Sequence, residues 1–443
     1  MKHALKLTIA LAIAGSAMNA QSADLLQVYR DAVGFDAQYA AARAARDAGR
    51  EKLPQGRAGL LPTIGLSANT TWSDIESTAR TSPPVTRSAA YNTNAWGVSL
   101  SQPLFRWQNW VGYQQAELAV ASAETQFALA SQDLIVRVAQ AYFDVLLAQE
   151  TLATAQAQKV AIDQQLESAK RNFEVGTATI TDTHEAQARF DLTVAQEIAA
   201  ENDLTVKRQT LLTLTGKDAV ALKVLQPKVQ IGRPQPDDIG QWVASAETGN
   251  LGVQLAQTGL EVASREIEKQ RAGHYPTLDL VATHGRSAIG GSVIPGGTGS
   301  DSKSSTIGLQ LAVPLYAGGA VSSREREAVA LKEKARADLD LARRSATLGA
   351  RQAYLGVTAG LAQVRALEAG VASSQLAVES NKLGYEVGVR INIDVLNAQS
   401  QLFDTRQKLA KARLDTLIAQ LRLKAATGNL TEDDLATLNA LLK

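Results

Sequence analysis

The histidines are the side chains of this chain best suited to metal binding or acid–base chemistry, but they stand far apart, at His3, His184, His274 and His284. The chain has no cysteine, and no serine lies in the motif of a nucleophile elbow. The glycine-rich stretch 290–299 lacks the Gly-Lys-Ser/Thr ending of a phosphate-binding loop. A formal net charge of +1 gives no electrostatic case for nucleic-acid binding, which would need a basic face or stripe. We therefore expect no enzyme, no catalytic residue, no metal, no cofactor and no nucleic-acid partner.

Residues 1–23 have the pattern of a secretory signal peptide. Lys2 and Lys6 precede a short apolar run, and small residues follow it. The apolar run is too short to cross a bilayer, which needs about 20 apolar residues. The sequence therefore predicts export, with cleavage at Ala20 or Ala23, of a mature chain that has no disulfides.

The mature chain contains two copies of one pattern, separated by roughly 212 residues. The matching segments are short: Arg57–Thr63 with Arg271–Thr277, Gly97–Phe105 with Gly308–Tyr316, Phe173–Gly176 with Tyr385–Gly388, and Thr215–Gly216 with Thr427–Gly428. Each copy must be one unit that buries its apolar face against its neighbours. We therefore divide the chain into a first repeat at 24–228, a linker at 229–236 and a second repeat at 237–443. The second repeat is expected to end in a short tail helix capped by Thr431.

Long helices dominate both repeats. From 109 to 174 there is no proline, and apolar residues recur at spacings of three and four, as in Leu134, Val138 and Ala141. This pattern predicts one helix of roughly 66 residues, about 100 Å long, and a second at 321–386. Such lengths indicate coiled-coil or tubular packing. Shorter helices are expected at 24–55, 181–214, 237–270 and 393–426.

Four strands are predicted between the helices. Apolar residues alternate with small or polar ones at 64–72, 96–101, 278–283 and 306–313. Segments of roughly ten residues with one apolar face are typical of transmembrane β-strands. A soluble sheet with one wet face has the same period, but aromatic residues near the strand ends favour a membrane interface: Trp72, Trp96, Phe105, Trp107 and Trp110. The polar segments 73–93 and 286–305 are expected to be exposed hairpin loops.

The number of strands has a consequence for assembly. Four strands cannot close a membrane barrel, because the smallest barrels have about eight and an open edge in lipid leaves backbone groups unpaired. The chain must therefore assemble with further copies. The predicted fold class is a mostly α-helical α+β membrane protein built from two internal repeats.

The chain resembles the TolC family of outer-membrane channel-tunnels over nearly all of its mature length. The most specific stretch is Tyr385–Gln399, and the first repeat offers Phe173–Asp182. The resemblance implies a homotrimer in which each chain adds four strands to a twelve-stranded transmembrane β-barrel, continued by a long periplasmic α-helical barrel. It also implies contacts with a periplasmic adaptor, an inner-membrane transporter and outer-membrane lipid.

The resemblance further implies a gate at the periplasmic end. Tyr385 and Arg390 match gate residues on the second repeat, and Thr181 and Asp182 match their partners on the first. An arginine and a phenol can hold a carboxylate and so join two helices, although an exposed pair contributes only about 0 to 1 kcal/mol. The residues alone leave other roles open, because Asp182 with Glu185 fits a helix capping box and Arg390 fits a solvated loop charge.

Two more sites follow from the resemblance. Asp394 matches an acidic position that would ring the entrance of a trimer and favour cations, although a lone helical aspartate is usually an ordinary surface residue. Close relatives in the family place a second acidic residue where this chain has Asn397, so we expect one acidic ring and weaker cation binding. Contact with the adaptor is expected at the hairpin tips, at Val175, Gly176, Val387 and Gly388.

These observations together predict an outer-membrane exit duct with a helical portion in the periplasm. It would serve a tripartite efflux pump and/or a type I secretion system and passively conduct small compounds or polypeptides. The alternative is a structural or adhesive coiled-coil protein of the cell surface. That class would share the long helices but would not need paired alternating strands.

Overall fold

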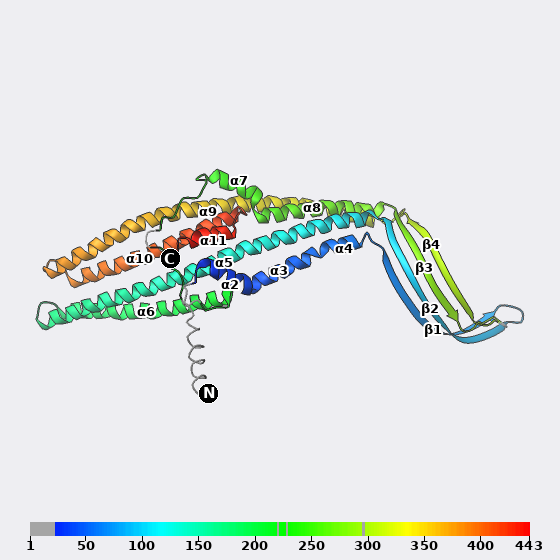
Figure 1. The fold of residues 1–443 in the computed structure, drawn as a ribbon, viewed down its shortest axis with the longest axis horizontal. Helices are drawn as coiled ribbons and strands as arrows, with labels where there is room; N and C mark the ends of the chain where they lie inside the picture. The colour runs from blue at the N-terminus through cyan, green and yellow to red at the C-terminus, as the bar shows by residue number, and fades with distance from the viewer. Residues whose placement is uncertain (1–22, 219–220, 227–228, 295–296) are drawn as a thin grey trace, which may run out of the picture. The chain divides into compact units, whose positions relative to one another are not determined.

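The computed structural model describes residues 23–218, 221–226, 229–294 and 297–443. The predicted signal peptide, apart from Ala23, lies outside the described residues. The first repeat contains α2 (Leu25–Phe35), α3 (Ala37–Arg50), α4 (Lys52–Ala58), β1 (Thr63–Ala79), β2 (Val85–Phe105), α5 (Trp107–Glu174) and α6 (Ile180–Thr215). The second contains α7 (Ile239–Gly249), α8 (Leu251–Arg271), β3 (Thr277–Ile289), β4 (Ser300–Ala312), α9 (Ala320–Glu386), α10 (Asn392–Ala426) and α11 (Glu432–Asn439) (Figure 1).

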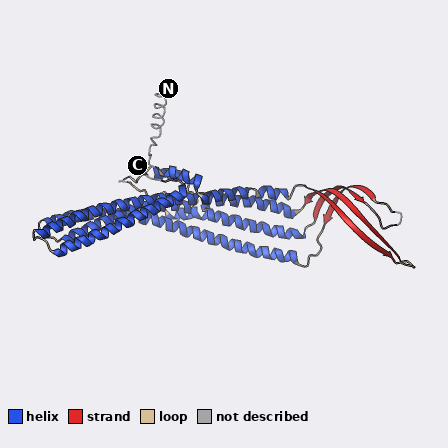
Figure 2. Ribbon diagram, turned by 90° about the horizontal axis from the view of Figure 1, so that it is seen from below, coloured by secondary structure: helices blue, strands red, loops and turns tan. Residues whose placement is uncertain are grey.

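The chain divides into two compact units, and each unit draws on both repeats. One unit comprises the residues up to Ala44, Phe127–Gln254 and Ala342–Lys443, and it contains the tips of two helical hairpins, α5–α6 and α9–α10. The other comprises Ala45–Gln126 and Leu255–Leu341 and contains the whole sheet, drawn in red in Figure 2.

The long helices are confirmed. α5 and α9 have 68 and 67 residues, and α6 and α10 return antiparallel to them as predicted. The tail helix is α11, and Thr431 is its N-cap. Among the described residues, no helix combines the length and the apolar character needed to cross a membrane.

The predictions of single helices at 24–55 and 237–270 are wrong. Each segment is broken at a short polar residue, and the first is broken again at Glu51, between α3 and α4. Asp36 separates α2 from α3, and its carboxylate accepts a hydrogen bond from the N–H three residues on at 2.6 Å. Asn250 separates α7 from α8, and its side-chain oxygen accepts from the N–H two residues on at 2.9 Å. Such a side chain offers the backbone a partner outside the helical ladder. The break is thus a shared feature of the two repeats.

The four strands form one antiparallel sheet in the order β1-β2-β3-β4. Its register places apolar side chains on one face, including Ile64, Leu66, Trp72, Trp96, Val98, Leu100, Leu280, Ile307, Leu309 and Leu311. Small and polar residues occupy the other face, as in Ser67, Ser99, Thr283 and Thr306. The predicted alternation is confirmed. Among the described residues, β1 and β4 each have one edge without a partner strand.

The predicted hairpin loops at 73–93 and 286–305 are largely strand. β1 pairs with β2 as far as Ala79 opposite Val85, and β3 pairs with β4 as far as Ile289 opposite Ser300. Threonine favours extended backbone, and facing hydroxyls bond across the strands, as Thr78 and Thr86 do at 3.0 Å. The apolar alternation therefore stops where these polar segments begin, but the pairing of the strands continues through them.

A hydrophobic core lies where α2, α5, α10 and α11 meet. It buries Leu25, Leu134, Val138, Tyr142, Leu417 and Leu435. The hydroxyl of Tyr142 donates to the carbonyl oxygens of Lys223 and Ala23 at 2.8 and 3.2 Å. Burial raises the pKa of Tyr142 far above its usual range, so the phenol stays a neutral donor. This core fixes the base from which both hairpins extend.

Candidate functional site at the helical hairpin tips

The two hairpins turn at their tips with the same geometry. Gly176 and Gly388 have φ of +78° and +80°, a region that side chains with a Cβ enter only with strain. In each turn two successive N–H groups donate to a single helical carbonyl: Thr177 and Ala178 to Asn172 at 2.8 and 3.1 Å, and Val389 and Arg390 to Gly384 at 2.9 and 3.0 Å. The repeat seen in the sequence therefore extends to individual hydrogen bonds at the tips.

Apolar side chains at the tips point into solvent. Val175, Val387 and Val389 are 73, 65 and 76 % exposed, and Ile180 and Ile391 are also exposed. Turn residues need no apolar side chains for their own folding, so these residues form a surface suited to contact with another protein.

A groove of 930 Å³ lies between the tips of the two hairpins. It brings together three of the four predicted gate residues, Asp182, Tyr385 and Arg390, while Thr181 is exposed outside it. Among the described side chains, Asp182 has no hydrogen bond or ion pair with Tyr385 or Arg390. The phenol of Tyr385 instead accepts a hydrogen bond from Asn172 at 3.0 Å, which joins α9 to α5.

Asp182 caps the helix on which it lies. Its carboxylate accepts from the N–H of Thr179 at 2.9 Å, and the Thr179 hydroxyl accepts from the N–H of Asp182 at 3.2 Å. This is a capping box. The predicted capping partner Glu185 is wrong, because Asp182 is the third residue of α6 and therefore closes the box backwards, to Thr179. One carboxylate oxygen is left without a hydrogen bond to a described residue.

Asp394, the residue of the predicted acidic ring, and Asn397, which stands where close relatives have a second acidic residue, both have partners from the chain itself. Arg390 Nη1 lies 3.6 Å from Asp394 Oδ2, one helical turn away. The Arg390 side chain is 59 % exposed, so water weakens this pair. Asn397 accepts a hydrogen bond from Arg189 at 2.9 Å, which joins α10 to α6.

Sequence reasoning missed Asn392, the first residue of α10. This side chain is only 1 % exposed. It accepts a hydrogen bond from the amide of Gln165 on α5 and donates to the backbone carbonyl of Asp182 on α6 at 3.5 Å. One buried amide therefore connects the second hairpin to both helices of the first. A polar residue at the start of a helix is usually interpreted as an N-cap. The sequence alone therefore does not indicate that Asn392 is buried between the two hairpins.

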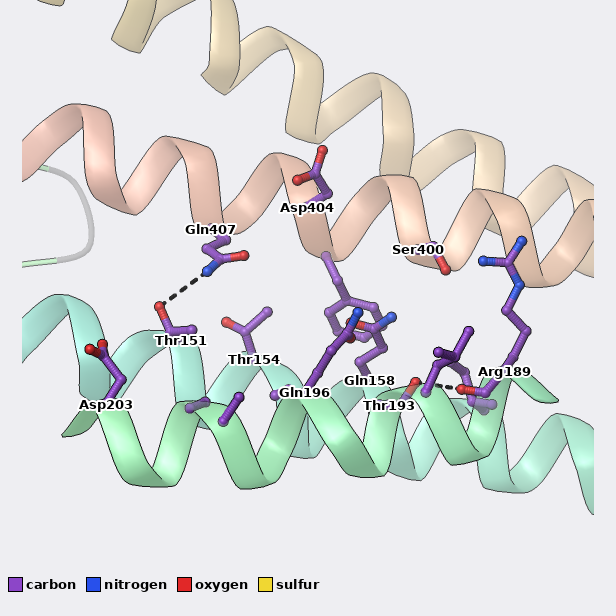
Figure 3. A pocket seen from close by; sticks show the side chains of 16 residues that line it. Thr151, Thr154, Gln158, Arg189, Thr193, Gln196, Asp203, Ser400, Asp404 and Gln407 are labelled. Carbon is purple, nitrogen blue, oxygen red and sulfur yellow. Dashed lines mark hydrogen bonds between the residues drawn. The ribbon is translucent and has the colours of Figure 1, made fainter. Parts of the chain in front are cut away.

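Farther from the tips, a second groove of 540 Å³ lies between the first hairpin and α10 (Figure 3). Polar side chains dominate its wall, among them Thr151, Gln158, Arg189, Gln196, Asp203 and Gln407. Gln407 donates to the hydroxyl of Thr151 at 3.3 Å and joins α10 to α5.

The apolar cluster nearest the tips is small, with Ile162, Leu166, Ala169, Ala186 and Leu396. Few buried apolar contacts hold the hairpins together here, which favours local rearrangement.

Among the described residues, no group of histidine, aspartate and glutamate side chains has the geometry to hold a metal ion. The tip chemistry is instead that of polar links between helices and of exposed apolar turns. Such links can hold two helices together and can be exchanged at small cost.

Known proteins resemble this chain over most of its length. The profile of the family described as outer membrane efflux protein matches residues 10–217 and 242–429. The chain is 33 % identical to the outer membrane protein TolC of Vibrio cholerae over 443 residues, which covers 100 % of this chain and 99 % of that protein. It is 34 % identical to the proteases secretion protein PrtF of Dickeya chrysanthemi, covering 99 % of this chain and 95 % of that one.

Solved structures show the same fold. The outer membrane protein VceC of Vibrio cholerae superposes with a TM-score of 0.77 at 18 % identity, over 91 % of this chain and 96 % of that one. The outer membrane channel CmeC of Campylobacter jejuni superposes with a TM-score of 0.79 at 17 % identity, over 94 % and 89 % of the two chains. Because the profile match covers most of both repeats and relatives at about a third identity span the full length, this chain belongs to the outer membrane efflux protein family.

Proposed function

We propose that the chain forms the outer-membrane exit duct of a tripartite efflux pump and/or a type I secretion system, with its helices in the periplasm. The observation that carries this proposal is the open four-stranded sheet with one apolar face, in a chain of the efflux protein family. Relatives named for secretion support it: PrtF, and the alkaline protease secretion protein AprF of Pseudomonas aeruginosa, which is 33 % identical over 93 % of this chain. The paired strands argue against an adhesive coiled-coil protein. The duct itself has no catalytic role.

A homotrimer would close the sheet. The two partnerless edges, on β1 and β4, belong to antiparallel strands, so β4 of one copy can pair with β1 of the next. In lipid each unpaired backbone group costs several kcal/mol, which makes closure obligatory. Three copies of four strands would form a twelve-stranded barrel.

The helices carry a matching signal for assembly. On α9 a stripe of exposed leucines follows one heptad register, with alanine at the two intermediate positions 362 and 369; Leu341, Leu348, Leu355, Leu376 and Leu383 are between 56 and 65 % exposed. On α6 exposed Leu192 and Val206 lie two heptads apart. A seven-residue apolar repeat is the pattern of a helix that packs along a second helix in a left-handed supercoil. Because α9 packs its other face within the chain, this stripe is available to a neighbouring copy.

The tips would act as the gate and as the adaptor contact. Asp182, Tyr385 and Arg390 line one groove, which supports their role as exchangeable links between the hairpins, with Thr181 at its margin. Asp394 in three copies would form one acidic ring, and the pairing of each Asp394 with Arg390 would reduce the negative charge of that ring. The exposed turns at Val175, Gly176, Val387 and Gly388 would contact a periplasmic adaptor that joins the duct to an inner-membrane transporter.

Deletion of the gene tests the function. Sensitivity to toxic compounds and loss of a secreted polypeptide should be measured separately, with complementation by the wild-type chain. If both are unchanged, the proposed duct is wrong.

Two sheet variants test the assembly. Leu309→Arg places a charge on the apolar face, where arginine costs about 2–4 kcal/mol at the bilayer midplane. It should abolish the heat-sensitive trimer recovered from outer-membrane fractions. Thr306→Arg, on the opposite face of the same strand, should leave the trimer intact. Equal loss in both variants, or a wild-type monomer, contradicts the proposed barrel.

A further inference from the structure

We infer that Arg286 and Lys303 form a binding site for phosphate groups of outer-leaflet lipids. Arg286 of β3 lies directly opposite Lys303 of β4, and Trp96 of β2 lies directly opposite Arg286 on its other side. The register places this row of three on the apolar face of the sheet. The site goes beyond the duct function, because conduction requires no lipid ligand.

The row lies where the apolar face ends. Along β4 the face carries Leu311, Leu309 and Ile307, then Ser305 and Lys303; along β3 it carries Leu278, Leu280 and Ala282, then His284 and Arg286. Tryptophans favour the boundary between hydrocarbon and head groups; Trp96 stands in this row, and Trp72 lies on the same face two same-face positions farther toward the hairpin end of β1. In β3 and β4 the row is also near the hairpin end, away from the ends that continue toward helices. In the proposed orientation this is the outer leaflet.

The charges of the row are not balanced within the chain. Like charges directly opposite each other destabilise a strand pair. Asp301, on the same face, accepts from Arg286 Nε at 2.7 Å and forms a second contact with the guanidinium. Among the described side chains, Lys303 has no hydrogen bond or salt bridge. Arg286, Lys303 and Asp301 together therefore keep a net charge of +1, directed toward the lipid head groups. A phosphate would supply the acceptor that Lys303 lacks.

The surroundings suit a head group. A hollow of 630 Å³ beside the row is lined by Thr70, Asn94, Trp96 and Arg286, among others. On the apolar side, His284 contacts the Ser305 hydroxyl at 2.7 Å and packs edge-on to Trp96 at 5.8 Å between ring centres. The site thus combines two aromatic rings in contact, two cations and polar groups beside an apolar surface. This combination fits an amphiphilic lipid whose phosphate lies at the boundary between hydrocarbon and head groups.

A neighbouring copy is the competing occupant. β4 is an edge strand, and Asp74 and Glu76 of β1 lie on the same face as Trp72, so a second copy could bring a carboxylate to Lys303. We favour the lipid, because Arg286 lies on β3, one strand inward from the edge strand β4, and Trp96 lies one strand farther in. A neighbouring copy that pairs with β4 would not reach these two residues.

Native mass spectrometry of the detergent-purified protein tests the site with two probes, a bis-phosphorylated lipid A and the same lipid after enzymatic removal of its phosphates. The wild type should bind the phosphorylated lipid roughly tenfold more tightly, since each cation near a membrane surface is worth about 1 kcal/mol. Arg286→Gln with Lys303→Gln should abolish this preference. Arg87→Gln, which removes a cation from the opposite face of the same sheet, should keep it.

Two results would overturn the inference. One is equal binding of the two lipids by the wild type, or an unchanged preference in the double variant. The other is that Lys303→Gln lowers the dissociation temperature of the trimer in lipid-free detergent as much as Asp74→Asn with Glu76→Gln does, while the lipid preference is unchanged. The second result would assign Lys303 to the interface between copies.

Discussion

Gln165 and Asn392 form a hydrogen bond between two helical hairpins, although 227 residues separate them in the chain. The bond is the buried part of a polar contact whose exposed members are Asn172 with Tyr385 and Arg189 with Asn397. Links of this kind hold the hairpin tips together with little apolar area, so the tips can separate without unfolding either hairpin.

Asn392→Ala should loosen the contact between the hairpins. It removes both hydrogen bonds of the side chain and leaves the half-buried Gln165 amide without this partner, at a cost of about 1–3 kcal/mol. We expect higher single-channel conductance in planar bilayers and a lower dissociation temperature. Asn397→Ala, which removes one exposed link, is the matched control and should have a smaller effect on both. Equal effects of the two substitutions would contradict the role of Asn392.

Tyr385→Phe combined with Arg390→Ser should raise single-channel conductance. The double variant removes the phenol that accepts a hydrogen bond from Asn172 of the other hairpin, and it removes the positive charge of Arg390 from the groove between the tips. Lys408→Ser is the control, because it removes a similar exposed i,i+4 pair, with Asp404, on α10 at a distance from the tips. Unchanged conductance in the double variant would exclude these residues from the gate.

Asn397→Asp should tighten block of the channel by a trivalent cation such as hexamminecobalt. Three added carboxylates would supplement those of Asp394, and the dissociation constant of the blocker should fall by roughly tenfold or less. Part of the added charge will be neutralised by Arg189, which already contacts this position at 2.9 Å. Asp394→Asn should weaken block. A blocker affinity that responds to neither substitution would place the acidic ring elsewhere.

Asp36→Asn should destabilise the protein at neutral pH. Arg137 donates two hydrogen bonds to this nearly buried carboxylate at 2.9 and 3.2 Å, and this contact, helped by the N–H of Tyr39, lowers its pKa. A lowered pKa means that the carboxylate stabilises the folded state above about pH 4 and that this stabilisation is lost as pH falls through the folded pKa. We expect a loss of about 1–2 kcal/mol at pH 7.

Thermal unfolding followed by circular dichroism from pH 7 down to pH 2 measures this effect. The difference between the wild type and Asp36→Asn should shrink as the pH falls. Asp133→Asn removes a half-exposed carboxylate that contacts the same Arg137 at 2.6 Å, and it should cost less than about 1 kcal/mol. If the two substitutions cost the same, burial of Asp36 does not set the strength of its pair.

Some of the candidate site was readable from the sequence. The positions of Tyr385, Arg390, Asp182 and Asp394 near the tips follow from the helix stops at the two turns, which glycine marks directly. The partners of these residues were not readable. Asp182 bonds to Thr179 rather than Glu185, and Asn392 is buried against the other hairpin, because capping and burial depend on where the chain turns and on what packs there.

The sequence by itself determined the repeat, the two long helices and the two faces of the sheet, because apolar spacings of three to four and of two express which side of an element is buried. Only the tertiary structure decided that Asp36 and Asn250 break their helices, that polar segments continue the strands, and which side chains meet between the hairpins. These features depend on hydrogen bonds to local turns or to residues of the other repeat. Unlike the burial of apolar faces, such bonds do not produce a periodic pattern in the sequence.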